Sequence, residues 1–257
     1  MSNILEQISL KGKKAIVTGG ARGLNYSMAE GLCEAGADVV LVDVSANVFE
    51  SASVLGKLGT NVYAVQGDLT NTPDLDRIYQ EALAHLGGHL DILINGAGIQ
   101  YRCLAKDFPE DAWRRVLDLN LNALFFFAQR AGRTMLEQGY GRLINIASLS
   151  SFDGASMIAA YTASKGGVAQ LTKVLSTEWA EQGVNVNAIA PGYMVTELTR
   201  NIKEVNPKQY ESICTRIPKG RWGQPEDLKG LAVFLASDAS EYITGQIIPV
   251  DGGYLSK

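Results

Sequence analysis

The sequence alternates regularly between short apolar segments and longer segments with helical periodicity. The apolar segments are rich in Val and Ile, and several end in Gly, Asn or Asp. Continuous apolar strands that alternate with helices are typical of a parallel sheet covered by helices on both faces. The sequence therefore predicts an α/β fold with a doubly wound parallel sheet of about seven strands. The predicted strands are 15–19, 38–43, 62–66, 91–94, 142–147, 184–190 and 246–250.

One segment interrupts this alternation. Residues 192–224 are rich in polar side chains and contain Pro207 and Pro218. They follow the sixth predicted strand, and parallel sheets bind ligands at the carboxyl ends of their strands. We therefore interpret residues 192–224 as a substrate-covering insertion within a single domain, residues 1–257. The predicted helices are 24–35, 46–58, 73–86, 109–136, 161–179 and 225–236.

Composition limits the kinds of partner. The formal net charge is −4 and no block rich in Lys and Arg occurs, so we expect a small-molecule substrate and neither nucleic acid nor a membrane as partner. Residues 1–14 lack the continuous apolar stretch of a secretory signal. Cys33, Cys103 and Cys214 are far apart and form no CxxC motif, which is typical of reduced thiols. We expect a cytoplasmic protein.

Glycines mark the turn between the first predicted strand and the first predicted helix. Gly19, Gly20 and Gly23 allow a tight turn and the close approach of a diphosphate to the amides that begin the helix. Asp43 ends the second strand, where a carboxylate accepts hydrogen bonds from the adenosine ribose and repels a 2′-phosphate. Asp43 therefore favours NAD over NADP, whereas Arg22 favours the opposite. Together these features predict a Rossmann-type sheet.

Tyr161 and Lys165 place a phenol and an ammonium four residues apart on one face of a predicted helix. An exposed pair at this spacing contributes only about 0.2–0.5 kcal/mol. Lowering the pKa of a tyrosine from about 10 to near neutrality needs about 4 kcal/mol. The pair is therefore useful for catalysis only in a partly dry pocket, ideally beside a second cation such as an oxidised nicotinamide ring.

Several motifs occur in a characteristic order. They are the glycine turn, Asn95-Gly96-Ala97-Gly98, Asn120, Ser148, Tyr161-x-x-x-Lys165 and Pro191-Gly192. In this order, and nearly from end to end, the sequence resembles the short-chain dehydrogenases/reductases. It departs from the usual pattern of that family at two positions, because Asn25 stands in place of a third glycine and Gly96 in place of a second asparagine.

The resemblance implies a role for each catalytic residue. Tyr161 would be the general acid/base that exchanges a proton with the substrate oxygen. Lys165 would lower the pKa of Tyr161 and hold the nicotinamide ribose. Ser148 would donate a hydrogen bond to the substrate oxygen, and Asn120 would anchor a water molecule that links Lys165 to solvent.

The resemblance also implies a set of cofactor contacts. Asp68 and Leu69 would contact the adenine, residues 95–98 the adjacent ribose, and Thr196 the carboxamide. The full expected set is Gly19, Arg22, Gly23, Leu24, Asp43, Asp68, Leu69, Asn95, Ala97, Gly98, Tyr161, Lys165, Pro191, Met194 and Thr196.

Polar residues surround the predicted reaction site. Arg102 could bind a carboxylate through two parallel hydrogen bonds, and Ser150 lies close in sequence to Ser148. We therefore expect Arg102, Ser148, Ser150 and Tyr161 to contact the substrate. Several later segments resemble the sugar-acid branch of the family, which includes gluconate 5-dehydrogenase and the dehydrogenases of 2-deoxygluconate and 2-dehydro-3-deoxygluconate.

The leading hypothesis is an NAD(H)-dependent oxidoreductase that interconverts a secondary alcohol and a ketone on a sugar acid or polyol. A 3-oxoacyl thioester reductase and a non-catalytic dinucleotide-binding sensor are the alternatives. The sequence predicts no metal site, because no group of His, Cys and acidic residues has metal-ligand spacing. The resemblance further implies a homotetramer joined through the helices that contain Asn120 and Tyr161.

Overall fold

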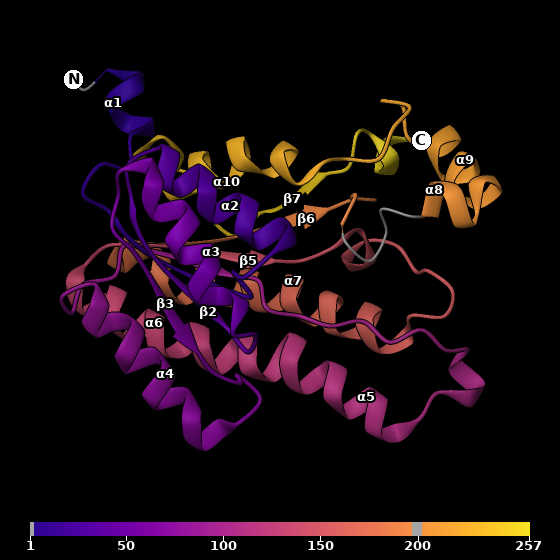
Figure 1. Ribbon diagram of the computed structural model, residues 1–257, viewed down its shortest axis with the longest axis horizontal. Coiled ribbons are helices and arrows are strands. Elements are labelled where there is room, and N and C mark those ends of the chain that lie inside the picture. The colour runs from indigo at the N-terminus through magenta and orange to yellow at the C-terminus, as the bar shows by residue number, and fades with distance from the viewer. Residues whose placement is uncertain (1–2, 197–201) are drawn as a thin grey trace.

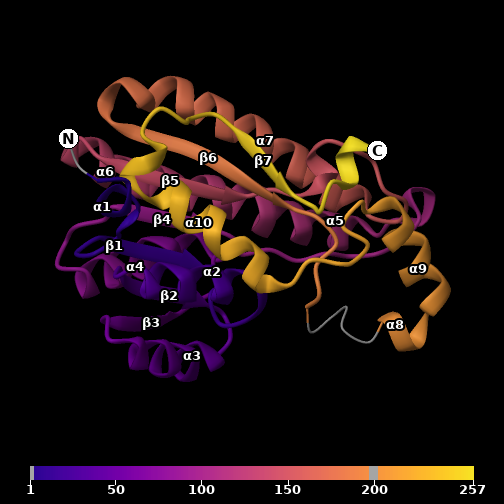
Figure 2. The same cartoon turned by 90° about the horizontal axis from the view of Figure 1, so that it is seen from above.

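The computed structural model describes residues 3–196 and 202–257. Its strands form one sheet in the order β3-β2-β1-β4-β5-β6-β7 (Figure 1, Figure 2), and all neighbouring strands are parallel. The predicted doubly wound parallel sheet is confirmed, and every strand end lies within one residue of its predicted position. The strands are β1 Lys14–Thr18, β2 Asp38–Asp43, β3 Val62–Gln66, β4 Ile92–Asn95, β5 Gly141–Ile146, β6 Val184–Pro191 and β7 Ile247–Val250.

The helices differ more from the prediction. The predicted helix 109–136 is two α-helices joined by a π-helical segment, Asp118–Ala123. The last predicted helix begins with a 3-10 turn, Pro225–Leu228. Helices α1, α8 and α9 were not predicted, because the first two are short and the last two lie in the insertion. The α-helices are α1 Ile4–Ile8, α2 Gly23–Glu34, α3 Asn47–Leu55, α4 Thr72–His85, α5 Glu110–Leu117, α6 Leu124–Gln138, α7 Ala159–Trp179, α8 Ile202–Val205, α9 Pro207–Arg216 and α10 Lys229–Ala236.

The sheet lies between two layers of helices. Helices α2, α3 and α10 cover one face, and α4, α6 and α7 cover the other (Figure 1). On β1, Val17 packs against the first layer and Ile16 against the second, and both side chains are fully buried. Because both faces of the sheet are covered, successive strand positions are apolar and show no alternation with polar residues.

The order of the strands creates a crevice at one edge of the sheet. The chain fills one half of the sheet with β1 to β3 and then crosses to β4, which pairs with β1 on its other side. Thr18 and Asn95 end these two neighbouring strands. The turns that follow them diverge to opposite sides, and parallel sheets bind ligands at such a point.

The predicted insertion 192–224 follows β6. Residues 197–201 of this segment lie outside the described part of the chain, whereas α8 and α9 extend past the carboxyl ends of the strands (Figure 1, Figure 2). A separate apolar cluster of Leu149, Ile217, Trp222 and Tyr254 fastens the segment to the turn after β5. Residues of this segment therefore share a small core with the turn after β5 and with Tyr254.

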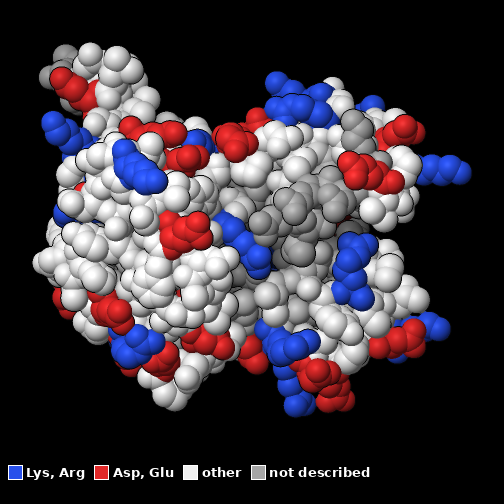
Figure 3. Space-filling model, in the orientation of Figure 1, with Lys and Arg blue, Asp and Glu red and all other residues white. Residues whose placement is uncertain are grey.

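On the face seen in Figure 3, positive and negative side chains are mixed. Lys and Arg side chains are interspersed with Asp and Glu, and no large area of one sign is visible there. Within residues 3–196 and 202–257, every helix is too short or too polar to span a lipid bilayer.

Candidate active site

Tyr161 and Lys165 lie on α7, next to the end of β5. Lys165 is almost completely buried, with 3% of its surface exposed, and its Nζ donates a hydrogen bond of 2.5 Å to the carbonyl oxygen of Ile146. The same Nζ lies 5.6 Å from the centroid of the Tyr161 ring. The fold thus provides the dry pocket that the predicted pair requires.

Burial changes the acidity of both side chains. Burial lowers the pKa of Lys165 to about 8. Burial also raises the pKa of Tyr161, and the hydrogen bond between Tyr161 and Ser148 partly offsets this rise by lowering it. The pKa of Tyr161 is thus shifted by its buried surroundings and by Ser148, and the lowering of this pKa by Lys165 stays a prediction. A second cation near the ring would lower the Tyr161 pKa further.

Ser148 begins the turn that follows β5. Its Oγ accepts a hydrogen bond of 3.1 Å from the backbone N–H of Ser150. The Ser148 side chain is also hydrogen-bonded to the Tyr161 side chain. The hydroxyl of Ser151 donates to the carbonyl oxygen of Lys165 at 2.7 Å. This contact joins the Ser148 turn to α7. The sequence analysis missed Ser151, whose role depends on the relative position of two distant segments.

Asn120 lies in the π-helical segment and is fully buried. Its Oδ1 accepts a hydrogen bond from the N–H of Ile99 at 2.8 Å, and its Nδ2 donates to the Ile99 carbonyl at 2.9 Å and to the Ser164 hydroxyl at 3.2 Å. Irregular helical turns of this kind are frequent at functional sites. Asn120 thereby connects the loop after β4 to α7.

The glycine turn and Asp43 lie close together at the carboxyl ends of β1 and β2, where the nucleotide is expected. Helix α2 begins after Arg22 without a side-chain cap, so the first amides of the helix have no capping side chain. The Asp43 carboxylate accepts hydrogen bonds from the N–H groups of Ala21 at 3.1 Å and Ser45 at 2.9 Å. Gly20 is tightly confined, since an added Cβ would lie 3.0 Å from Leu41. These residues fit a dinucleotide.

Most other predicted contacts follow the ends of strands at the same edge. Leu69 is buried after β3, and Asp68 beside it is exposed. Asn95 differs, because its buried amide donates to the carbonyl oxygen of Leu124 at 2.8 Å and so faces the interior. Gly23 and Leu24 begin α2, Ala97 and Gly98 follow β4, and Pro191, Met194 and Thr196 end or follow β6.

Two further residues connect the turns after β1 and β4. The Thr18 hydroxyl accepts hydrogen bonds from the N–H groups of Gly96 and Ala97, at 2.9 and 3.3 Å. The Asn25 amide donates to the carbonyl oxygens of Gly96 at 2.9 Å and Gly19 at 3.3 Å. The sequence analysis missed the role of Thr18, which is the one polar residue within the apolar part of β1 and could have been noticed for that reason.

Arg102 is exposed on the loop after β4. The next residue, Cys103, donates its N–H to the carbonyl oxygen of Met157 at 2.8 Å, so the loop pairs with the segment just before α7. Met157 has a φ of 69°, which is unusual for a residue other than glycine. Among the described residues, Arg102 has no ion-pair or hydrogen-bond partner. Its charge is available to a ligand.

The comparisons with known proteins agree with this geometry. A family model described as enoyl-(acyl carrier protein) reductase matches residues 19–255. The chain belongs to the short-chain dehydrogenase/reductase family. This short-chain enzyme is an NAD(P)-dependent oxidoreductase.

Relatives of the enzyme include sugar-acid dehydrogenases. It is 45% identical to 2-dehydro-3-deoxy-D-gluconate 5-dehydrogenase of Bacillus subtilis, with 100% of both chains covered. It is 41% identical to gluconate 5-dehydrogenase of Gluconobacter oxydans, with 95% of each chain covered. A gluconate 5-dehydrogenase from Burkholderia cenocepacia, solved in complex with NADP and tartrate, superposes with a TM-score of 0.94 at 37% identity, covering 99% of this chain and 100% of the other.

The enzyme's two histidines lie away from this site. His85 stacks on Tyr63, and His89 lies 3.2 Å from Asp91 at the other edge of the sheet. In the described ranges, 3–196 and 202–257, no three His, Cys, Asp or Glu side chains form a group that could hold a metal ion.

Proposed function

We propose that the enzyme interconverts a secondary alcohol and a ketone on a sugar acid, with Tyr161 as the general acid/base. The observation that supports this most directly is the convergence of Ser148, Tyr161 and the buried Lys165 at the carboxyl end of β5. The sugar-acid relatives support the class of substrate.

Residues of the chain accept the proton that the substrate hydroxyl releases. In the oxidation, the substrate hydroxyl lies between Ser148 and Tyr161 and gives its proton to the phenolate oxygen. At pH 7 a pKa of about 8 leaves Lys165 mostly charged, so it supplies one positive charge close to the phenol. The bound oxidised nicotinamide supplies the hydride acceptor and a second positive charge. Both charges favour the phenolate.

Asn120 and Lys165 connect this pocket to solvent. Asn120 anchors a water molecule that links the Lys165 ammonium to the outside. Its Oδ1 accepts one hydrogen bond, from Ile99, and therefore has a lone pair left for this water. Lys165 also holds the nicotinamide ribose.

NAD is the preferred cofactor in this proposal. Asp43 ends β2, and its carboxylate uses hydrogen bonds from Ala21 and Ser45, which fix it without neutralising it. A 2′-phosphate beside it would meet like charge. Arg22 and the NADP bound to the Burkholderia relative favour NADP instead. We give more weight to Asp43 because it lies at the end of the strand where the ribose binds.

Arg102 binds the carboxylate of the substrate. It is exposed, has no ionic partner among the described residues, and lies on a loop that pairs with the segment leading to Tyr161. The described parts of the insertion 192–224 form a wall next to the Ser148 turn, through the contact of Trp222 and Ile217 with Leu149. Ser150, whose N–H donates to the Ser148 Oγ, also contacts the substrate in this proposal.

A substrate panel tests the proposal. Each aldonate is paired with the polyol of equal length, with NAD and NADP, and KM is measured for the wild type, Arg102→Met and Arg102→Lys. We expect turnover of an aldonate with NAD, and an increase in KM of about tenfold in Arg102→Met for the aldonate but not for the polyol. The Lys variant keeps the charge and should lose less. Turnover of no aldonate would contradict the sugar-acid proposal.

One alternative function has a specific observation in its favour. The matching family model is described as enoyl-(acyl carrier protein) reductase, which names an acyl thioester as the class of substrate, so a 3-oxoacyl thioester with NADPH belongs in the same panel. Asp43 argues against it. A non-catalytic sensor has no such support, because the pocket brings Ser148, Tyr161 and Lys165 together.

The enzyme is a homotetramer and cytoplasmic in this proposal. A groove of about 780 Å³ between α6 and α7 is lined by Leu121, Phe125, Leu171 and Val174, and a second copy would cover this apolar surface. Light scattering should give four chains, and Val174→Glu should give a smaller species. The cytoplasm suits the free thiols of Cys33, Cys103 and Cys214.

A further inference from the structure

Asn25, on α2, and Gly96, in the turn after β4, lie against each other. A Cβ added to Gly96 would lie 2.3 Å from Oδ1 and 2.6 Å from Cγ of Asn25. Real Cβ atoms do not approach other atoms so closely. The Asn25 side chain therefore fills the space that any side chain at position 96 would need.

Asn25 also makes hydrogen bonds across the crevice. Its Nδ2 donates to the carbonyl oxygen of Gly96, which follows β4, and to that of Gly19, which follows β1. Gly19 is confined as well, since an added Cβ would lie 2.8 Å from the same Nδ2. One amide thus connects the two turns at the point where the strand order reverses.

We propose that Asn25 is a positioning residue that sets the distance between these two turns for the dinucleotide, and that position 96 is glycine because Asn25 occupies its side-chain space. An asparagine at position 96 facing a glycine at position 25 would place an amide in the same space from the turn after β4. The inference rests on the proposed function only in that the crevice holds the cofactor.

The first experiment tests the steric part without cofactor. Thermal midpoints are measured for Gly96→Ala, Asn25→Gly and the double variant. Gly96→Ala should lower the midpoint by about 4–8 °C, because overpacking a confined site is costly. In the Asn25→Gly background the same change should cost less than half as much. An equal loss in both backgrounds would overturn the proposed coupling.

The second experiment tests the positioning part through NADH fluorescence. Asn25→Asp has the same shape but loses both donated hydrogen bonds and places a carboxylate before two carbonyl oxygens. We expect its dissociation constant for NADH to rise about tenfold. Asn3→Asp, an exposed cap of α1 remote from the crevice, is the control with the same charge change. The exchange Asn25→Gly with Gly96→Asn should bring the constant back to within about threefold of the wild type.

The two experiments separate the possible failures. If Asn25→Asp loses thermal stability but binds NADH as well as the wild type, Asn25 is only a packing residue and the positioning claim is wrong. If the wild type binds neither NADH nor NADPH, the proposed cofactor site itself is wrong, whereas the thermal midpoints still decide whether Asn25 and Gly96 are coupled.

Discussion

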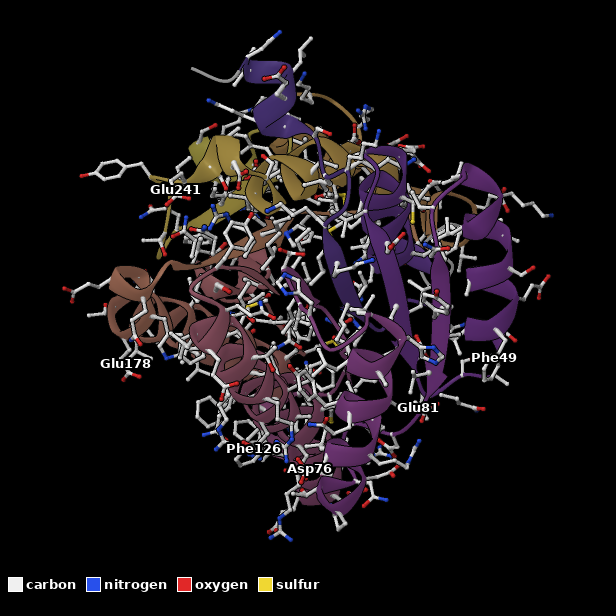
Figure 4. All side chains as sticks on the ribbon, turned by 90° about the vertical axis from the view of Figure 1, so that its left-hand side faces the viewer. Phe49, Asp76, Glu81, Phe126, Glu178 and Glu241 are labelled. Atoms are coloured by element: carbon white, nitrogen blue, oxygen red, sulfur yellow. The ribbon has the colours of Figure 1, made fainter. Side chains whose placement is uncertain are left out.

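The two edges of the sheet use their polar residues differently. At the amino edge, charged groups have charged partners: Lys14 pairs with Asp38 at 2.5 Å, and Arg142 pairs with Glu241. At the carboxyl edge, Asp43 and Lys165 bond to backbone groups instead. Figure 4 views the molecule from the amino side and labels Glu241, the exposed partner of Arg142.

We infer from this difference that the charged groups at the amino edge stabilise the fold, whereas those at the carboxyl edge serve function. Arg142 is fully buried, yet its guanidinium also donates to the carbonyl oxygens of Ser237 and Gly141 and lies 4.5 Å from the centre of the Tyr140 ring. Such a group has little capacity left for a ligand. Lys165 has the opposite character, because no acidic side chain within residues 3–196 and 202–257 forms an ion pair with it. Unpaired charge at one edge is available for chemistry.

The largest effect is expected from the carboxyl edge. Tyr161→Phe removes the proton donor and acceptor and should lower kcat by about a thousandfold or more. NADH should bind with nearly the same dissociation constant, because the ring remains. Stopped-flow turnover and NADH fluorescence measure the two quantities. Turnover close to that of the wild type would refute the assigned role.

The next largest effect is a loss of stability from a substitution at the amino edge. Arg142→Met should lower the free energy of unfolding by about 3 kcal/mol, because buried hydrogen bonds and an ion pair are lost. Urea denaturation measures this, and kcat per folded molecule should not change. Arg114→Met is the control, since the ion pair between Arg114 and Glu110 is exposed and worth little. Equal losses in both variants would contradict the distinction.

The pH dependence of the free energy of unfolding should also reveal that Lys165 is buried without an acidic partner among the described residues. Its folded pKa of about 8 lies below the ordinary 10.5 of the unfolded chain, so between these values the unfolded state binds more protons and stability rises with pH. Relative to Lys165→Met, the wild type should gain about 2 kcal/mol between pH 7.5 and 9.5. The difference between the two proteins removes contributions of other groups, such as Cys33, whose pKa burial raises to about 11. Parallel curves would show that Lys165 is not desolvated.

The smallest expected effect is a change in cofactor preference, which should differ between substitutions at the two ends of β2. Asp43→Ala at the carboxyl end of β2 should reduce the preference for NAD over NADP by about tenfold, measured as the ratio of kcat/KM. Asp38→Ala at the amino end should leave that ratio unchanged and lower stability instead, because Asp38 pairs with Lys14. An unchanged ratio in Asp43→Ala would remove the argument for NAD.

The sequence predicted the sheet well because its strands are buried on both sides and therefore continuously apolar. It also indicated Ser148, Tyr161 and Lys165 through their spacing and order. It could not show that Asn25 meets Gly96, or that Ser151 reaches Lys165, because those contacts join segments far apart in the chain. The π-helical turn at Asn120 was missed for a similar reason, since its side chain bonds to the loop after β4.

A third group of polar contacts lies on the helices that cover the sheet, away from both strand edges. Phe126 on α6 and Asp76 on α4 lie near each other at the bottom of Figure 4, where Arg130 donates to both the Asp76 carboxylate and the Phe126 carbonyl. This contact joins two helices of one layer away from both strand edges.

The aromatic packing of Trp222 gives the enzyme an internal optical probe. Trp222 is buried, stacks on Tyr210 with ring centres 5.4 Å apart, and belongs to the same cluster as Leu149. Trp113 lies on α5, and Trp179 packs against Gly132 on α6. Indole emission from Trp222 will therefore follow any shift of the turn beside Ser148, and replacing the other two tryptophans by Phe would isolate that signal.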